Sequence, residues 1–330
     1  MEIAFTECVA IKDASSVGEV RRTAAAAAIK LKLDETRAGE LAILATEVTR
    51  NVLIHGGGGQ VIIAGLQNTA GPLARIVALD SGRGIENLAE AMKDGFSTAG
   101  TMGAGMGAMK RLAKHFEIFT GRGGTMVLLE VGEGPSSSHV EFAGMALPYP
   151  GERVCGDGWY CEHTPGRTIA VLADGLGHGL GAADAAQEAI ATVRQRILKS
   201  PGEILNYMHD ALKKTRGAVA AVVEVRPTEG KVTYAGIGNI SASILSKGVS
   251  RSLISHNGTL GMTVQRVQEF HTEWSPDSVF VMHSDGLHAK WDLLSYAGLI
   301  SRHPALICGA LIRDFRRQRD DAGVVVLKAA

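Results

Sequence analysis

Aromatic residues are scarce in this chain, neither charge is in excess, and no long apolar run is present. Phe, Trp and Tyr make up 5% of the 330 residues, which argues against a surface that stacks single-stranded nucleic acid. Lys+Arg and Asp+Glu number 34 each, so no global field attracts nucleic acid or an acidic membrane. No apolar run reaches the roughly 18 residues of a membrane span, and the N-terminus lacks a secretory pattern. We therefore expect a cytoplasmic protein that binds neither nucleic acid nor membrane.

Cysteine is also rare, and its spacing indicates no metal or redox motif. The four cysteines form neither a CxxC pair nor a pair with metal-ligand spacing: Cys8, Cys155, Cys161 and Cys308. In a cytoplasmic chain this pattern predicts four reduced thiols.

The length of the chain and one break in its composition predict two domains. A chain of 330 residues, 45% hydrophobic, is long enough for two compact cores. The run Gly-Glu-Gly-Pro-Ser-Ser-Ser at 132–138 suits neither helix nor sheet. We predict domains over 1–132 and 140–330, joined by a linker over 133–139.

The N-terminal half predicts an α/β sandwich, with two helices against a mostly antiparallel sheet. An alanine-rich helix is expected over Ser15–Lys30, capped by Ser15 or Ser16, and Asp34 is expected to cap a second helix that runs to about Ile54. A shorter helix is expected near Met106–His115. The strand-like stretches are Gln60–Leu66, Leu73–Asp80 and Thr125–Val131.

The C-terminal half is richer in strands and predicts a sheet sandwich flanked by helices. Two long consecutive helices are expected, over Ala182–Leu198 and Pro201–Lys214. The expected strands are Val140–Leu147, Thr168–Ala173, Ala218–Val225, Lys231–Gly236, Ser241–Ser246, Ser278–His283 and Gly323–Leu327.

Polar residues and glycines recur in the N-terminal half in an order typical of a phosphate site. Glu47, Asn51 and His55 fall at i, i+4 and i+8 and share one face of the second helix, although a solvated face produces the same pattern. Asp-Ser-Gly-Arg-Gly (80–84) ends a strand, and Gly-Ala-Gly-Met-Gly (103–107) opens a helix. Free backbone N–H groups at such a helix start can hold an anion. A Rossmann site is disfavoured, because 103–107 is not GxGxxG and no strand leads directly into it.

This order resembles the N, G1 and G2 boxes of the GHKL ATPases (Bergerat fold) over residues 10–131. Asp-Gly-Phe-Ser-Thr-Ala-Gly (94–100) and Gly-Ala-Met-Lys-Arg-Leu (107–112) look like the RsbT-type switch kinases, which phosphorylate serine on small STAS-domain proteins. The resemblance implies that ATP binds with Mg²⁺, that Asn51 holds the Mg²⁺, and that Asp80 accepts a hydrogen bond from the adenine amino group. Glu47 would orient or deprotonate the attacking serine. The remaining nucleotide-binding positions would be Gly82, Gly84, Gly103, Gly105, Gly107 and Thr125.

Three basic residues near this site have two interpretations each. His55 either approaches a phosphate or closes the C-terminus of its helix, where a partly charged imidazole is favourable; we favour the second. Lys110 and Arg111 are either phosphate ligands or part of a solvated face.

Four aspartates in the C-terminal half carry the clearest chemical signal. Each lies beside a hydrophobic, strand-like run, and glycine directly follows three of them: Asp157, Asp174, Asp285 and Asp320. Carboxylates at strand ends, with glycines that let the backbone come close, suit hard divalent cations. Two metals roughly 3.5–4 Å apart could activate a water against phosphorus.

The same set resembles the PPM (PP2C-like) serine/threonine phosphatases over about 140–330, which implies an α-β-β-α sandwich. The closest likeness is to the RsbX-type phosphatases and, more distantly, to SpoIIE. The resemblance implies that Asp157 bridges two Mn²⁺ or Mg²⁺ ions and that Asp174, Asp285 and Asp320 complete the cage, with the carbonyl of Gly158 or Gly175 as a further ligand. The segments in family order are Cys-Gly-Asp (155–157), Ala-Asp-Gly-Leu-Gly (173–177), Arg-Gly-Ala (216–218), Gly-Asn (238–239), His-Ser-Asp-Gly-Leu (283–287) and Arg-Asp-Asp (319–321).

Several neighbouring positions are less certain. The motif places the ligand at Asp320 rather than Asp321, and Gly323 replaces the usual threonine, a departure that bears on packing more than on chemistry. Arg153 matches the phosphate-gripping arginine of larger PPM enzymes only loosely. His178 is either a general acid or a residue packed at a helix start, and His283 is expected to be a core histidine.

Together these features predict a bifunctional regulator of a bacterial stressosome or sigma-factor pathway. An RsbT-like kinase half and an RsbX-like phosphatase half would act on STAS-domain antagonists or scaffolds of the RsbS/RsbR kind, releasing a downstream regulator, and the chain could form oligomers. Two alternatives remain open. The GHKL half could be a nucleotide sensor without kinase turnover, or it could sequester a partner protein.

Overall fold

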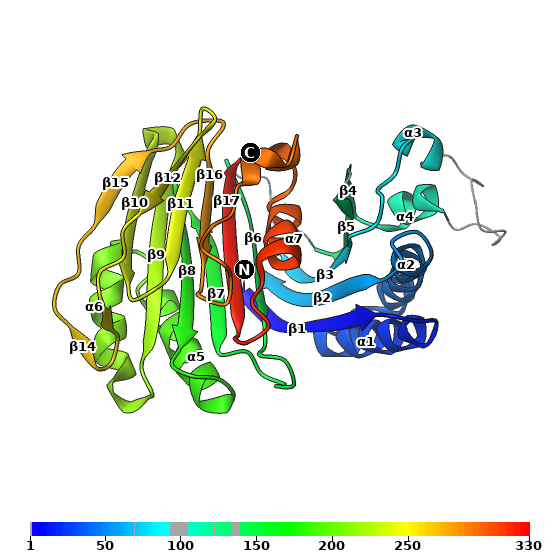
Figure 1. The fold of residues 1–330 in the computed structure, drawn as a ribbon. Coiled ribbons are helices and arrows are strands. Elements are labelled where there is room, and N and C mark those ends of the chain that lie inside the picture. The colour runs from blue at the N-terminus through cyan, green and yellow to red at the C-terminus, as the bar shows by residue number, and fades with distance from the viewer. Residues whose placement is uncertain (1, 69, 93–104, 122, 134–138) are drawn as a thin grey trace. The chain divides into compact units, whose positions relative to one another are not determined.

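The computed structural model describes residues 2–68, 70–92, 105–121, 123–133 and 139–330. Two compact units divide the chain: Ile3–Ser136, and Ser137–Ala330 together with Met1–Glu2. Figure 1 follows both units from the blue N-terminus to the red C-terminus. The last strand of the first unit ends at Gly132 and the next strand begins at Val140. Residues 134–138 of the predicted linker lie outside the described residues.

The N-terminal unit is the predicted α/β sandwich. Its sheet has the order β1-β2-β3-β5-β4, and β2, β3, β5 and β4 pair antiparallel. Helices α1 and α2 pack together and against β2 and β3. The bounds are β1 Glu2–Ile11, α1 Ser15–Leu31, α2 Glu35–Ile54, β2 Gly59–Asn68, β3 Gly71–Asp80, α3 Leu88–Ala91, α4 Met106–Leu112, β4 His115–Gly121 and β5 Gly124–Gly132.

The two long helices of this unit begin differently. Asp34 caps α2 as predicted, since its side chain accepts a hydrogen bond from the Arg37 amide. The prediction that Ser15 or Ser16 caps α1 is wrong: Ala14 occupies the N-cap without a side-chain bond. Ser16 is buried in the first turn, where its hydroxyl accepts from the Lys12 amide. Serine in a first turn can bond to the preceding backbone instead of capping.

The C-terminal unit contains two facing antiparallel sheets, as predicted. One has the order β15-β10-β9-β8-β7 and the other β12-β11-β16-β17-β6. The bounds are β6 Val140–Leu147, β7 Asp157–Thr164, β8 Arg167–Gly175, β9 Ala218–Arg226, β10 Lys231–Ile237, β11 Ser241–Ser246, β12 Val249–Leu253, β13 Gly258–Thr259, β14 Thr263–Val264, β15 Phe270–Glu273, β16 Val279–His283 and β17 Ala322–Ala329.

Helices cover both outer faces of this sandwich. The predicted pair, α5 Leu180–Gln195 and α6 Pro201–Ala211, packs on β7, β8, β9 and β10. A third helix, α7 Pro304–Phe315, packs on β17 and β6 of the other sheet. The sequence reading missed α7, because its segment is buried from Pro304 to Ile312 and has no polar face to give a helical period.

Large side chains fill the space between the two sheets. Trp159 of β7 is 1% exposed and lies under Gly144 of β6, where a Cβ would come within 2.4 Å of the indole. Tyr234 of β10 and Phe280 of β16 face each other with ring centroids 6.0 Å apart. This aromatic contact packs the two sheets against each other.

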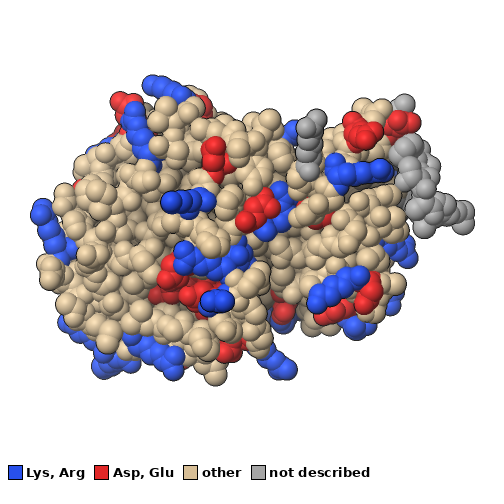
Figure 2. All heavy atoms as spheres, in the orientation of Figure 1, with Lys and Arg blue, Asp and Glu red and all other residues tan. Residues whose placement is uncertain are grey.

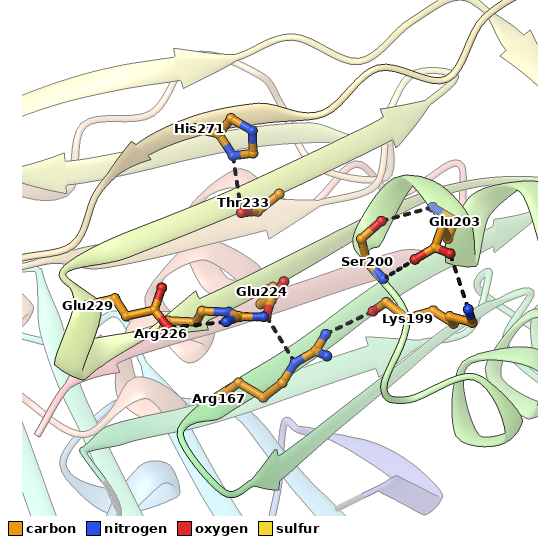
Figure 3. Close-up of polar contacts among 9 residues, drawn as sticks. All are labelled: Arg167, Lys199, Ser200, Glu203, Glu224, Arg226, Glu229, Thr233 and His271. Atoms are coloured by element: carbon orange, nitrogen blue, oxygen red, sulfur yellow. Dashed lines mark hydrogen bonds and ion pairs between the residues drawn. The ribbon is translucent and has the colours of Figure 1, made fainter.

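A buried ionic network ties β8, β9 and the α5–α6 connection together (Figure 3). The Glu224 carboxylate is flanked by Arg167 Nε at 3.0 Å and Arg226 Nε at 2.6 Å. Arg167 also donates to the Lys199 carbonyl at 2.9 Å, and burial lowers the pKa of Arg167. Ser200 and Glu203, which form a capping box, then begin α6. The network lies at the start of β8, at the opposite end of the strand from Asp174.

Replacing Glu224 by alanine is expected to destabilise the fold by about 3 kcal/mol, because it leaves Arg167 buried without its counter-charge. Urea unfolding measures this loss. The matched control is Glu229→Ala: Glu229 also pairs with Arg226 but is 53% exposed, so its loss should cost less than about 0.5 kcal/mol. Equal effects of the two changes would contradict the argument.

Three expectations from composition can be compared with the fold. In the described part of the chain, no helix combines the length and the apolar character needed to cross a bilayer. On the face drawn in Figure 2, basic and acidic side chains are interspersed, in keeping with their equal numbers. All four cysteines are unbridged, as predicted.

Candidate metal centre and nucleotide site

The four predicted aspartates lie at one end of the two facing sheets. Asp157 begins β7, and Asp174 lies one residue before the end of β8. Asp285 comes just after β16, and Asp320 just before β17. Because β7 pairs with β8 and β16 with β17 antiparallel, the start of each strand lies beside the end of its neighbour. The topology therefore brings together carboxylates that are distant in the sequence.

Asp157 and Asp174 are direct partners across the β7–β8 ladder. The pKa of Asp157 is raised to about 8, chiefly by burial and also by the nearby charges of Asp321, Asp285 and Asp320, while the hydrogen bond from Ser284 opposes the rise. Burial, followed by the charge of Asp157, raises the pKa of Asp174 to about 9. The charge of Asp157 thus opposes ionisation of its ladder partner Asp174. Both carboxyls of such a pair are ionised at neutral pH only when a cation lies beside them.

A cavity of about 450 Å³ opens at this end of the sandwich. Three of the four aspartates line it: Asp174, Asp285 and Asp320. The other lining residues are small, amide or apolar: Leu176, Gly177, Val219, Gly238, Asn239, Asn257 and Gly258. The fourth aspartate, Asp157, is 4% exposed. Carboxylates thus supply all the formal charge of the lining.

Asp320 and Asp321 have different surroundings. Asp320 faces the cavity, whereas Asp321 is 3% exposed and accepts a hydrogen bond from the Tyr149 amide at 2.8 Å. Burial raises the pKa of Asp321. This is the arrangement that a ligand role for Asp320 and a structural role for Asp321 require.

The donor set suits a hard divalent cation. Asp157 Oδ1 is buried, and no donor among the described residues reaches it; such an oxygen is costly to bury unless a cation or a proton meets it. The carboxylates do not yet enclose one point, since no three His, Cys, Asp or Glu side chains in the described ranges form a closed ligand set. The shared cavity and the buried Asp157 oxygen are the observations that support these aspartates as candidate ligands.

One hydroxyl group and one side-chain amide orient the carboxylates. The sequence analysis predicted a role for neither residue. Ser284 Oγ donates to Asp157 Oδ2 at 2.6 Å and accepts from the Gly323 amide at 2.9 Å. Asn239 Nδ2 donates to Asp285 Oδ2 at 2.7 Å. A Cβ on Gly323 would lie 2.9 Å from Asp157 Oδ2, so glycine at this position leaves room for the carboxylate itself. Both Asn239 and Ser284 lie in segments that carry the PPM resemblance.

The two glycines proposed as carbonyl ligands also have a packing role. Gly158 and Gly175 both lie under α5, where a Cβ on Gly158 would come within 2.7 Å of Ile190 Cδ1 and one on Gly175 within 2.0 Å of the Ala182 carbonyl. Close approach of α5 to the end of β8 thus requires glycine at 175, where the clash is with backbone, whereas a side chain at 158 would require the Ile190 side chain to shift. Their carbonyls as ligands stay a prediction.

The histidines near the site differ in their contacts. His283 is 1% exposed; its Nδ1 lies 2.8 Å from the Ser284 carbonyl, and its Nε2 accepts from Trp291 Nε1 at 3.0 Å. The prediction of a core histidine with satisfied partners is confirmed. His178 is exposed, contacts Glu152 Oε1 at 3.0 Å and stacks on Tyr149. These contacts hold its ring at the start of α5, as in the packing interpretation.

In the N-terminal unit, Asp80 organises the predicted nucleotide site. Its Oδ1 accepts from the Gly82 amide at 2.9 Å and from the Thr125 amide at 3.0 Å. Gly84 has φ +77°, and a Cβ there would lie 2.1 Å from the Gly121 carbonyl. Thr125 Oγ1 and Thr120 Oγ1 are 3.0 Å apart, and Thr120 accepts from the Ile85 amide. The end of β3 is thereby fixed against the start of β5.

Other predicted residues of this site lie on α2 and at the start of α4. Glu47 and Asn51 are half-buried on α2, and Glu47 pairs with Arg50 at 2.9 Å. His55 is the C-cap of α2, which is the position we favoured for it. Gly105 is the N-cap of α4 and Gly107 is buried within it. Gly103 and the 94–100 segment lie outside the described residues.

Each half of the chain matches a known family model. A family model described as Stage II sporulation protein E (SpoIIE) matches residues 164–330, slightly more than half of the 330 residues. The chain belongs to the SpoIIE family. In this SpoIIE-family chain, residues 11–131 match a second model, the histidine kinase-like ATPase domain. The predicted PP2C-type serine/threonine phosphatase domain and GHKL-type ATPase domain are thereby confirmed as families.

Individual relatives match one half of the SpoIIE-family chain each. Phosphoserine phosphatase RsbX of Bacillus subtilis (strain 168) is 26% identical over 157 residues, which cover 46% of this chain and 77% of RsbX. Serine/threonine-protein kinase RsbT of the same organism is 37% identical over 73 residues, 22% of this chain and 55% of RsbT. The chain thus spans about half the length of RsbT.

Two solved structures share the fold. One comes from work on "the bacterial stressosome: a modular system that has been adapted to control secondary messenger signaling"; it is 27% identical with TM-score 0.55, over 58% of this chain and all of that one. The other, RsbX in complex with magnesium, is 20% identical with TM-score 0.53, over 66% of this chain and 100% of that one.

Replacing Ser284 by alanine is expected to weaken metal binding about 10- to 100-fold, because Asp157 loses the group that orients it. Titration of the chelated protein with Mn²⁺, followed by calorimetry, measures the change. Ser278→Ala, in which a buried serine outside the site is altered, is the control. Unchanged Mn²⁺ affinity in the Ser284 variant would contradict the positioning role.

Metal removal is expected to make stability depend on pH. The pKa values of Asp157 and Asp174, about 8 and about 9, lie above the roughly 3.9 of an unfolded aspartate. Folding therefore favours the protonated carboxyls, and their stabilising contribution is present below about pH 4 and lost as pH rises towards 9. The melting temperature in EDTA should fall between pH 6 and 8.5, and the gain from added Mg²⁺ should widen. A gain independent of pH, or an Asp174→Asn variant with the same slope, would refute this.

Proposed function

We propose that this chain both phosphorylates and dephosphorylates serine or threonine on STAS-domain proteins in a stressosome-like pathway. The observation that carries the proposal is the presence in one chain of an acidic cavity at the strand ends of a PP2C-type unit and an Asp80-centred site in a GHKL-type unit. The similarities to a phosphoserine phosphatase and to a serine/threonine kinase support opposite activities.

In the phosphatase half, Asp157, Asp174, Asp285 and Asp320 would hold two Mn²⁺ or Mg²⁺ ions. The metal ions, when bound, supply an activated water and neutralise phosphoryl charge. The chain's own contribution is orientation: Ser284 fixes Asp157, and Asn239 fixes Asp285. The carbonyls of Gly158 and Gly175 are further candidate ligands.

In the kinase half, ATP would bind with Mg²⁺ around Asp80. Oδ2 of its carboxylate would receive the adenine amino group while Oδ1 remains bonded to the Gly82 and Thr125 amides. Gly84 would keep the backbone close, and Gly103, Gly105 and Gly107 would offer amides to phosphate. Asn51 would hold Mg²⁺, and Glu47 would accept the proton of the attacking serine hydroxyl.

STAS-domain partners of the RsbS/RsbR kind are proposed as substrates because the RsbT-like segment resembles kinases that act on such proteins. Similarity to a structure from stressosome work supports the same assignment. Switching between the two halves would release a downstream regulator.

The test uses the full chain and a purified STAS-domain protein encoded near it. With ATP and Mg²⁺, the partner should gain phosphoserine, seen as a shifted band on a phosphate-affinity gel. After ATP is depleted and Mn²⁺ added, the phosphate should be released. Failure to release phosphate from the phosphorylated partner in saturating Mn²⁺ would overturn the phosphatase half of the proposal.

A second candidate is an ATP- or ADP-regulated phosphatase whose GHKL half senses nucleotide or binds a partner without kinase turnover. The contact between Glu47 and Arg50 at 2.9 Å favours it, since the guanidinium occupies a carboxylate oxygen that would have to receive the serine proton. If phosphoserine never forms while ATP alters the rate of dephosphorylation, this candidate replaces the first.

A further inference from the structure

An exposed arginine lies beside the acidic cavity, on the turn that leads into β9. Arg216 follows Thr215, whose hydroxyl donates to the Leu212 carbonyl at 2.8 Å and accepts from the Gly217 amide at 3.0 Å. The Gly217 carbonyl accepts from the Leu176 amide at 3.1 Å. Since Leu176 lines the cavity, the backbone carrying Arg216 is fixed directly to the cavity wall.

The side chain of Arg216 extends across the start of α5. A Cβ on Gly181 would lie 2.5 Å from Arg216 Nε, and one on Gly177 would lie 3.6 Å from its Nη1. Gly177 itself lines the cavity. Glycine at these two positions therefore leaves the space in which the guanidinium lies, at the edge of the opening.

The guanidinium of Arg216 has no counter-charge among the residues that the structure describes. No carboxylate in the described part of the chain pairs with Arg216, although carboxylates supply the whole charge of the cavity beside it. Arg317 is a second cation in the region, since its charge opposes the rise in the pKa of Asp285. The backbone amide of Arg317 donates to the Gly286 carbonyl at 2.7 Å, next to Asp285 after β16.

A phosphoserine substrate brings a dianion to this opening. Its oxygens that do not meet metal need a donor, and a planar guanidinium offers two parallel N–H groups to a phosphoryl group. We propose that Arg216 binds the phosphoryl oxygens of the substrate at the rim of the metal cavity. This inference rests on the proposed phosphatase function and adds to it the residue that recognises the phosphate.

The test compares Arg216→Gln and Arg216→Lys with the unaltered full chain in Mn²⁺, on p-nitrophenyl phosphate and on a phosphorylated STAS-domain protein. We expect Arg216→Gln to raise KM about 10- to 100-fold on both substrates, with kcat changed only a few-fold, because a charged hydrogen bond to the phosphate is lost. Inhibition by inorganic phosphate should weaken by a similar factor. Arg216→Lys should recover part of the loss, and the melting shift caused by Mn²⁺ should be unchanged in both variants.

Arg251→Gln is the matched control, since it removes an exposed arginine of β12 outside the cavity. Arg153→Gln and Arg317→Gln test the two other exposed arginines that could meet the phosphate. If KM rises only for the phosphoprotein, Arg216 contacts protein rather than phosphate and the inference is wrong. It is equally wrong if Arg317→Gln or Arg153→Gln reproduces the effect and Arg216→Gln does not. An unaltered chain that hydrolyses neither substrate would instead refute the proposed phosphatase function, and this inference with it.

Discussion

Replacing Asp157 by asparagine is expected to lower phosphatase kcat/KM by about 10³-fold or more, because the site loses the carboxylate that would bridge both metals, worth several kcal/mol. The fold should persist, since Ser284 can still donate to the amide oxygen of the new side chain. A phosphate-release assay with the phosphorylated STAS partner in Mn²⁺ measures the loss.

The same variant should be more stable than the unaltered chain when metal is absent. Burial and nearby carboxylates raise the pKa of Asp157, so folding at neutral pH must either protonate this carboxyl or bury its charge, and an amide side chain avoids both costs. The melting temperature in EDTA should rise, and the response to Mn²⁺ should shrink. Asp184→Asn, on the exposed face of α5, should change neither property. An Asp157→Asn protein that keeps full activity would remove the basis of the proposed metal centre.

Replacing Glu47 by glutamine is expected to reduce phosphorylation of the STAS partner about 10²- to 10⁴-fold, the usual contribution of a general base. Binding of ATP should be retained, because the Asp80 site is formed by β3 and β5 and its bonds to Gly82 and Thr125 do not involve Glu47. Radiolabelled phosphate transfer and the melting shift caused by ATP measure the two properties separately.

Two further variants make this result interpretable. Asp80→Asn should abolish the ATP-dependent melting shift as well as transfer, because the adenine-binding carboxylate is lost. Arg50→Gln removes the partner of Glu47 at 2.9 Å and should leave transfer within a few-fold of the unaltered chain. If Glu47→Gln transfers phosphate normally, Glu47 is not the base, and the assignment from the family resemblance fails.

The sequence predicted most of the regular elements because their signals are local. Asp34 and the apolar periodicity that follows it predicted the start of α2. Strands β6 and β11 were predicted with the same bounds as in the structure. Helix α7 was not predicted, because its buried residues from Pro304 to Ile312 leave no polar face to show a helical period. The cap of α1 was predicted wrongly, because the Ser16 hydroxyl bonds to the preceding Lys12 amide instead.

The candidate sites divide in the same way. The residue types and their order, from Asp157 to Asp320 and from Glu47 to Thr125, were enough to indicate a metal-dependent phosphatase half and an ATPase-like half. The spacing could not show that Ser284 orients Asp157, because the two are 127 positions apart. Nor could it show that Arg216 lies against Gly177 and Gly181.

By itself, the sequence determined the two families and the chemical character of each site, because carboxylates beside glycine at strand ends are a local pattern. Only the tertiary structure decided which of Asp320 and Asp321 faces the cavity, why Gly323 stands beside Asp157, and which groups support the ligands. These relations depend on antiparallel strands that place the start of one segment beside the end of another. The pKa of an aspartate also shifts only through the neighbouring charges and the burial that folding provides.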